Sequence, residues 1–455
     1  MKGLHMAKKK ELNMTEGSVI KPLILFILPL IGSSIFQQLY NTADYWFVGN
    51  YLGRPAAAAV GASSSLITCT IGLFTGISLG TNVVTAQYIG AKKKEEANRT
   101  LHSSLAFGLG GGAILAILAM ILAPWILQVL NTPQSSMVDA VLYMRLYLMS
   151  LPVIISYNMC AGALRACGDS KTPFHILVLC GFINVIADAI CVIVLQWGVA
   201  GVAAATAISQ TLSLVLALWV LSKEGRPIRF SFKNLKIDSE ILMQVLKIGL
   251  PSGFQSIMIT FSNVVVQYYI NSFGEVAVAA FATYYKVENF IYLPIMAFGQ
   301  AATTFTGQNV GAQQYKRIRK GIPVIAGIGA CVVLCIAIVM LSFPQQIFGF
   351  FIKDADVVVH TLTIASISFP LYWIYPIMEV TSGSVRGMGK SVSSMIIVLF
   401  NICALRIVLL AVFSKTVNTL EALASVYPIT WACATGCFAV LFLMMIQKKC
   451  KAVMV

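Results

Sequence analysis

Charged residues and histidine are scarce in this chain. Asp, Glu, Lys and Arg make up 11% of its 455 residues, and none of the four histidines lies within motif distance of another. A ligand frame such as HExxH therefore cannot be built, and we predict no bound metal and no organic cofactor. None of the eleven cysteines falls in a loop that we assign to the outside of a membrane, so the sequence predicts no disulfide framework.

Long apolar runs dominate instead. Hydrophobic residues account for 58% of the chain, and runs of about 20 such residues match the roughly 30 Å hydrocarbon core of a bilayer. Because lipid cannot satisfy backbone polar groups, such runs form helices. We predict an all-α integral membrane protein with twelve spans, near residues 19–49, 56–84, 99–130, 139–163, 172–196, 200–222, 241–272, 277–306, 319–346, 356–384, 391–414 and 420–447.

The second half of the chain repeats the first. Leu28-Pro29 returns 222 residues later as Leu250-Pro251, and Arg165 returns 221 residues later as Arg386. Each copy has six predicted spans, so both begin on the same side of the membrane. They are then parallel repeats related by a pseudo-two-fold axis along the membrane normal, an organisation found in many secondary transporters.

The repeats predict the division of the chain. It comprises an N-terminal tail (1–18), an N-lobe (19–222), a polar linker (223–240), a C-lobe (241–447) and a C-terminal tail (448–455). The linker is basic and contains Gly225 and Pro227, as expected of a loop.

The net charge of +15 reflects membrane orientation. With both termini in the cytoplasm, cytoplasmic segments hold 25 Lys and Arg residues and outer loops hold three. This positive-inside bias favours a multi-pass protein of the cell membrane with cytoplasmic termini and lipid contacts. It also argues against nucleic acid as a partner, because the positive charge does not gather on one soluble surface.

Two carboxylates fall inside predicted spans. Asp44 lies in the first span and Asp188 in the fifth, where Asn184 precedes it by one helical turn. A charge at membrane depth costs about 2.5–3.5 kcal/mol, which a proton or bound cation would offset. The alternative for Asp44 is a position near the outer interface, where water simply solvates it.

Several motifs together resemble the multidrug and toxic compound extrusion (MATE) family over nearly the whole chain. They are Leu28-Pro29 through Gln37-Gln38-Leu-Tyr40-Asn41 to Asp44, Ala86-Gln87-Tyr-Ile-Gly90-Ala91, Ala163-Leu-Arg165-Ala-Cys-Gly168-Asp169-Ser-Lys171-Thr-Pro173, Gly198-Val-Ala-Gly201-Val-Ala-Ala-Ala-Thr206 and Gln308-Asn-Val-Gly311-Ala312. The resemblance implies export of amphipathic, often cationic organic compounds, coupled to H⁺ or Na⁺.

The resemblance also implies roles for particular residues. Asp44, Asn184, Asp188 and Thr206 match a coupling cluster of prokaryotic relatives, and Pro29 matches a proline at which the first span bends. Independently of the family, proline removes an intrahelical hydrogen bond and permits a kink.

The C-lobe departs from some family branches, because its seventh span has no carboxylate. We therefore expect the coupling ion in the N-lobe. The C-lobe spans contain their own charges, which we expect to close a neutral ion-pair network, with a role in substrate binding or coupling as the alternative: Lys286, Glu288, Glu379 and Arg406. Candidates for the lining of a substrate cavity are Gln37, Tyr40, Asn41, Asn158, Glu288 and Glu379.

Two other functions stay open. A lipid-linked sugar flippase of the same superfamily tends to keep basic residues in its cavity, whereas this N-lobe is acidic inside. A membrane-embedded enzyme would need a nucleophile with its base, or a metal site, at membrane depth. We favour an antiporter, not an enzyme, and expect a monomer; the sequence does not choose between H⁺ and Na⁺.

Overall fold

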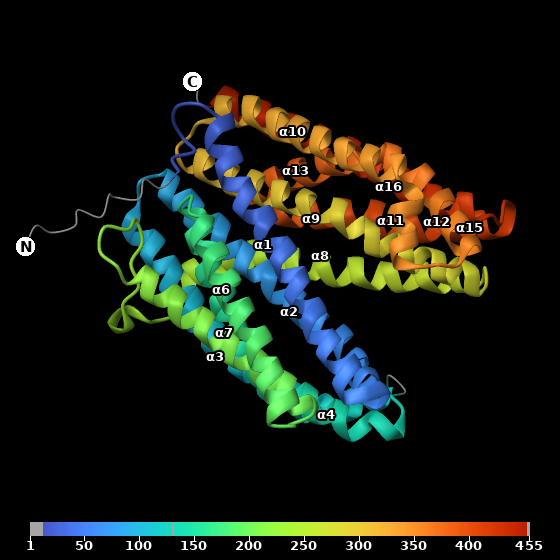
Figure 1. Cartoon of the computed structure of the whole chain (residues 1–455). Helices are drawn as coiled ribbons and strands as arrows, with labels where there is room; N and C mark the ends of the chain where they lie inside the picture. Colours follow the sequence, from blue (N-terminus) through green and yellow to red (C-terminus); the bar gives the residue numbers. More distant parts are fainter. Residues whose placement is uncertain (1–11, 130–131, 453–455) are drawn as a thin grey trace, which may run out of the picture. The chain divides into compact units, whose positions relative to one another are not determined.

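The computed structural model describes residues 12–129 and 132–452, so parts of both predicted tails and the end of the third predicted span lie outside it. Every regular element within these residues is a helix (Figure 1). The chain divides into two compact units, Met1–Leu246 and Lys247–Val455, which we call lobe one and lobe two.

The first lobe is built from helices that pack on partners up to three helices away, with the addition of α1, which packs on α6. They are α1 (Ile20–Phe47), the π-helical η1 (Val48–Leu52), α2 (Gly53–Gly90), α3 (Lys94–Val129), α4 (Gln134–Met149), α5 (Leu151–Ala166), α6 (Lys171–Asp188), the π-helical η2 (Ala189–Val194), α7 (Val199–Leu221) and the short 3₁₀ helix η3 (Phe232–Asn234).

The second lobe repeats this order. Its elements are α8 (Ser239–Asn271), α9 (Glu275–Gly311), α10 (Tyr315–Ser342), α11 (Pro344–Phe351), α12 (Ala355–Ser368), the 3₁₀ helix η4 (Phe369–Leu371), α13 (Ile374–Gly387), α14 (Ser391–Val398), the π-helical η5 (Leu399–Leu405), α15 (Arg406–Thr416) and α16 (Leu420–Ala452). The start of α8 belongs to lobe one, because the division follows Leu246.

Among the described residues, eight helices are long and apolar enough to cross a membrane, and two bent helix pairs raise the number to ten. The pairs are α4 with α5, bent by 43°, and α12–η4 with α13, bent by 52°, so the fourth span is bent in both lobes. Pro152 and Pro370 lie at the two breaks, where the missing N–H interrupts the helical ladder. Lobe one has five of these helices and one bent pair, which makes six spans. Lobe two has three helices and one bent pair. Its remaining two spans are α8 and α9, whose apolar runs are interrupted by polar residues. The prediction of an all-α membrane protein with two six-span lobes is confirmed.

A close helix contact recurs at repeat-equivalent positions. A Cβ on Gly162 of α5 would lie 2.9 Å from the Ser78 carbonyl oxygen of α2, and one on Gly383 of α13 would lie closer still to the Gly299 carbonyl oxygen of α9. Only glycine permits such an approach of two backbones. The duplication therefore preserved a contact at which the second and fourth spans almost touch.

Aromatic side chains distinguish the core of lobe two. Tyr372, Tyr375 and Trp431 pack ring against ring, with centroids 4.6–5.9 Å apart. Trp431 is buried, whereas the other five tryptophans of the chain are each at least 40% exposed: Trp46, Trp125, Trp197, Trp219 and Trp373.

Candidate functional site

The packing of α1 against α6 brings Asp44 and Asp188 together. Their carboxyl groups lie within hydrogen-bonding reach of each other. Asp188 is the last residue of α6 before η2, and Asp44 lies one turn before η1. Both acids therefore lie next to a π-helical turn. Single π turns inside α-helices are frequent at functional sites.

The protein leaves this cluster short of hydrogen-bond partners. Asp188, Asn184 and Thr206 are at most 4% exposed. Among the described residues, no group donates to Asp44 Oδ1 or to either Asp188 oxygen, and neither amide atom of Asn184 has a partner. Thr206 Oγ1 donates to Val202 O of its own helix at 3.1 Å, which keeps its lone pairs free.

Electrostatics define what such a cluster can hold. Two ionised carboxylates offer acceptors but no donor, and at this separation they repel. One proton shared between Asp44 and Asp188 would supply the missing donor and remove the repulsion. A small cation would do the same through oxygen ligands from the carboxylates, Asn184 and Thr206. The arrangement therefore suits a proton or an alkali cation.

Sequence reasoning missed the tyrosines around this cluster. Tyr143 and Tyr147 of α4 lie within electrostatic range of Asp44, and their rings are 6.1 Å apart. Tyr40, predicted to line a cavity, lies beside Gln210 of α7 and also near Asp44. The spacing of four residues puts Tyr143 and Tyr147 on one helix face, a signal that could have indicated a polar wall in the fourth span.

The remaining candidates of lobe one are more dispersed. Gln37 and Asn41 are exposed on α1. The amide of Asn158 donates to Ile154 O at 2.9 Å, within its own helix. α1 continues through Pro29 in this structure, and the Ser33 hydroxyl donates to Pro29 O at 2.8 Å. Bending at Pro29 stays a prediction.

The charges of lobe two do not pair as expected. Glu379 Oε1 accepts a hydrogen bond from Arg386 Nη2 at 2.5 Å, and both side chains are at most 10% exposed. Arg386 also donates to Ser382 Oγ at 2.8 Å. The tenth predicted span ends at residue 384, but α13 continues to Gly387, which places Arg386 two turns after Glu379 on the same helix. The acid and base of this pair therefore come from one helix.

The other three members of the expected network form no ion pair among the described residues, although Glu288 lies within electrostatic range of Arg406. Glu288 Oε1 accepts from the hydroxyls of Tyr372 at 2.6 Å and Tyr284 at 3.5 Å. The Arg406 guanidinium lies 4.8 Å above the Tyr427 ring. Lys286 is exposed and, like Arg406, makes no ion pair among the described residues. Tyrosine hydroxyls make the direct hydrogen bonds to Glu288, and a tyrosine ring lies against Arg406.

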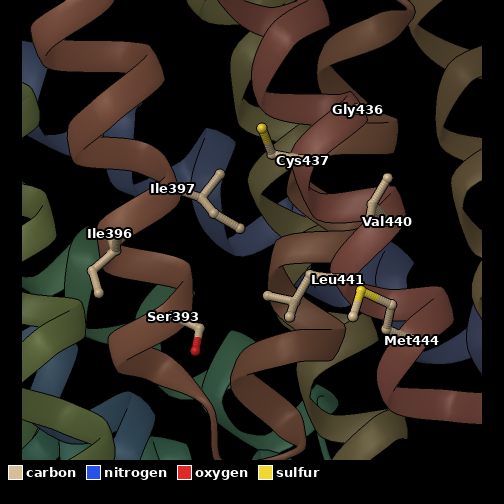
Figure 2. Close-up of a pocket in the computed structure, with 8 residues that line it drawn as sticks. All are labelled: Ser393, Ile396, Ile397, Gly436, Cys437, Val440, Leu441 and Met444. Carbon is tan, nitrogen blue, oxygen red and sulfur yellow. The ribbon is translucent and has the colours of Figure 1, made fainter.

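A pocket of about 570 Å³ lies between α14 and α16 of lobe two (Figure 2). Ser393 supplies its polar wall, and its other walls are formed by glycine, cysteine and apolar side chains: Ile396, Ile397, Gly436, Cys437, Val440, Leu441 and Met444. Ile396, Val440 and Met444 are largely exposed. On a membrane span, an apolar exposed surface of this kind faces lipid, so the groove is no site for ion coupling.

The fold is that of solved MATE transporters. A structure described as the outward-facing conformation of a multidrug resistance MATE family transporter of the MOP superfamily superimposes with a TM-score of 0.90 at 23% sequence identity, covering 97% of this chain and 99% of that chain. At this identity the likeness establishes the fold alone.

Sequence comparison establishes the family. The MatE family model matches residues 29–190 and again 251–412. The chain therefore belongs to the MatE family of membrane transporters, as its motifs predicted, and is not an enzyme.

Two relatives come from Bacillus subtilis (strain 168). The chain is 27% identical over 417 residues to the probable multidrug resistance protein YpnP, covering 89% of this chain and 91% of that protein. It is 26% identical over 395 residues to the probable multidrug resistance protein YoeA, covering 85% of each.

Proposed function

We propose that this protein is a cation-coupled antiporter that exports amphipathic, often cationic, organic compounds. Asp44 and Asp188, assisted by Asn184 and Thr206, hold the coupling ion, H⁺ or Na⁺. The single observation that carries the proposal is the pair of neighbouring carboxyl groups of Asp44, which is half-buried, and Asp188, which is buried. Among the described residues, no group donates to Asp44 Oδ1 or to either Asp188 oxygen. The names of the relatives YpnP and YoeA support drug export as the activity.

The ion and the drug would bind alternately. An empty carboxylate pair repels itself and attracts cations, whereas a pair holding a proton or Na⁺ is less negative and releases a cationic drug. Occupation of the pair would also favour a different packing of α1 on α6, with Pro29 permitting α1 to bend. The site then faces the cytoplasm to collect drug and the outside to collect the ion.

The available energy is sufficient for such an exchange. One positive charge moving inward through 100 mV gains about 2.3 kcal/mol. A tenfold ion gradient adds about 1.4 kcal/mol. Because the positive-inside bias assigns both termini to the cytoplasm, we propose that the protein lies in the cell membrane with this orientation.

Purified protein in liposomes tests the coupling role. Asp44→Asn and Asp188→Asn should each reduce gradient-driven efflux of a fluorescent organic cation to the level of empty liposomes. The matched control is Asp356→Asn, at an exposed position on α12, which should keep wild-type efflux. Unchanged efflux in either site variant would refute the proposal.

Imposing a pH gradient and a Na⁺ gradient separately identifies the ion. Only one of the two gradients should drive efflux by the wild-type protein, and Asp188→Asn should abolish that component.

A further inference from the structure

The connection between α7 and α8, residues 222–238, looks like a flexible linker by composition, but it packs on lobe one. We call this segment the strap. Ile228 and Phe230 are at most 5% exposed and join the same apolar core as Leu101 of α3 and Leu221 of α7. A polar loop free in solvent would not bury two large apolar side chains.

His102 of α3 holds the middle of the strap. Its ring stacks on Phe230 with centroids 5.6 Å apart and planes at 14°. Nδ1 lies 2.7 Å from Asn98 O, a carbonyl that can only accept, so Nδ1 carries the hydrogen. Nε2 is then free to accept the Ser231 backbone N–H at 3.0 Å. The contacts therefore fix one neutral tautomer of His102.

Two further backbone N–H groups of the strap have partners. The N–H of Arg229 donates to Asn98 Oδ1 at 2.7 Å, and that of Phe230 donates to Leu221 O at 3.0 Å. With Ser231, three consecutive amides are hydrogen-bonded outside any regular helix. Such bonding is typical of a segment that exchanges its amide hydrogens slowly.

Polar contacts also fasten both ends of the strap. Near its start, Arg226 pairs with Asp169 at 3.0 Å. At its end, Asp238 forms an ion pair with Arg99 of α3 and accepts the Ile241 N–H of the first turn of α8 at 3.2 Å. Ser103 Oγ accepts from Asp238 N at 3.0 Å.

The start of α8 is held in the same way. Gln244 Oε1 accepts from the Tyr88 hydroxyl of α2 at 3.0 Å, and lobe one extends to Leu246. A few residues later, α8 contains Pro251, which leaves the Lys247 carbonyl without its helical donor. Gly249 and Gly253 flank this proline, and both residue types weaken a helix.

We propose that the strap is a clasp that fixes the first two turns of α8 to lobe one, and that movement between the lobes is taken up inside α8 around Gly249–Pro251–Gly253. The composition of the linker would instead place the flexible joint in residues 222–238. The site of bending in α8 does not depend on which ion, if any, is coupled to transport.

Limited proteolysis tests the clasp, because the strap contains four trypsin sites: Lys223, Arg229, Lys233 and Lys236. Wild-type protein in micelles should resist cleavage there, and Phe230→Ala and His102→Ala should each raise the cleavage rate by about tenfold or more, as expected when a docked segment opens. The matched control is Ile237→Ala, which changes an apolar side chain of the strap that is 58% exposed. Trypsin should cleave this variant at the wild-type rate. Size-exclusion elution at the wild-type position identifies the variants that are folded. Wild-type cleavage as fast as that of the opened variants would refute the clasp.

Hydrogen exchange locates the pivot in the unmodified protein. The amides of residues 229–231 and 241–246 should exchange slowly, and those of residues 248–253 should exchange about tenfold faster or more. Pro251→Ala should slow exchange across 248–253 and lower the efflux rate, whereas Pro323→Ala in α10, a proline inside another long helix, should do neither. Faster exchange in the strap than in residues 248–253 would place the joint in the linker and overturn the proposal.

Discussion

Lobe one and lobe two share their helix order, their bent fourth span and the glycine contact between second and fourth spans, yet they treat buried charge differently. In lobe one, Asp44 and Asp188 lie near each other. Among the described residues, no base pairs with them and no group donates to Asp44 Oδ1 or to either Asp188 oxygen. In lobe two, Glu379 is bonded to Arg386, and Glu288 accepts from two tyrosine hydroxyls. The same fold thus holds an acid pair that lacks a hydrogen-bond donor in lobe one and an acid that is paired with a base in lobe two.

Repeat-equivalent positions show how the difference arose. Glu379 corresponds to Asn158 and Arg386 corresponds to Arg165, each 221 residues earlier. In lobe one the amide of Asn158 bonds its own helix, and Arg165 makes no ion pair among the described residues. The stabilising charge pair was thus built into one copy only, and the carboxylates of the other copy lie on different spans.

The largest expected contrast concerns stability. Glu379→Gln should lower the free energy of unfolding by about 3–5 kcal/mol, because it leaves Arg386 buried without a counter-charge. Asp188→Asn should leave this free energy unchanged or raise it, because it removes a buried carboxylate that has no donor. Thermal or chemical denaturation in micelles measures both. A similar loss of stability in the two variants would mean that both acids are structural.

A smaller contrast is expected at the glycine contact. Gly383→Ala should cost about 1–3 kcal/mol, since the added methyl group meets the Gly299 carbonyl oxygen, and Gly162→Ala should cost less because its contact is longer. Gly327→Ala in α10, where nothing lies within 4 Å of the added Cβ, should stabilise slightly. Denaturation curves of the three variants give the order; equal costs at Gly162 and Gly383 would show that the two contacts are equally tolerant.

The smallest effect is expected at the start of α8. The Ile241 N–H, together with the nearby Arg99, holds the pKa of Asp238 below its usual 3.8. A lowered pKa in the folded protein means that Asp238 stabilises above pH 3.8, and this contribution disappears as the pH falls through the folded-state value. Exchange of the Ile241 amide, corrected for intrinsic rates, should therefore speed up below about pH 4 in wild type and much less in Asp238→Asn. The same acid sensitivity in the variant would assign it to another group.

The sequence predicted the fold well because apolar length is a strong signal. It also placed Asp44, Asn184 and Asp188 in spans that the structure packs together, since helical spacing and the cost of a charge in lipid both single them out. Their coupling role stays a prediction. α8 and α9 do not appear among the helices that are long and apolar enough to cross a membrane, although the apolar runs of the sequence predict a span at each.

Pairing between side chains was less predictable. The predicted tenth span ends at residue 384, before Arg386, because the helix continues past the apolar run. The bond between Arg386 and Glu379 was therefore not predicted. The tyrosines near Asp44 were missed for a related reason. Their rings resemble ordinary core residues in a sequence, and only the packing of α4 shows where their hydroxyls lie.

The placement of the six tryptophans gives the protein two separable fluorescence signals. Five exposed indoles on membrane helices or their ends are accessible to brominated acyl chains or to iodide, which quench tryptophan emission. Trp431, enclosed by Tyr372, Tyr375 and Tyr427, is shielded from both. The emission that survives quenching should therefore come from lobe two alone, so its spectrum would report on that lobe during transport without any attached dye.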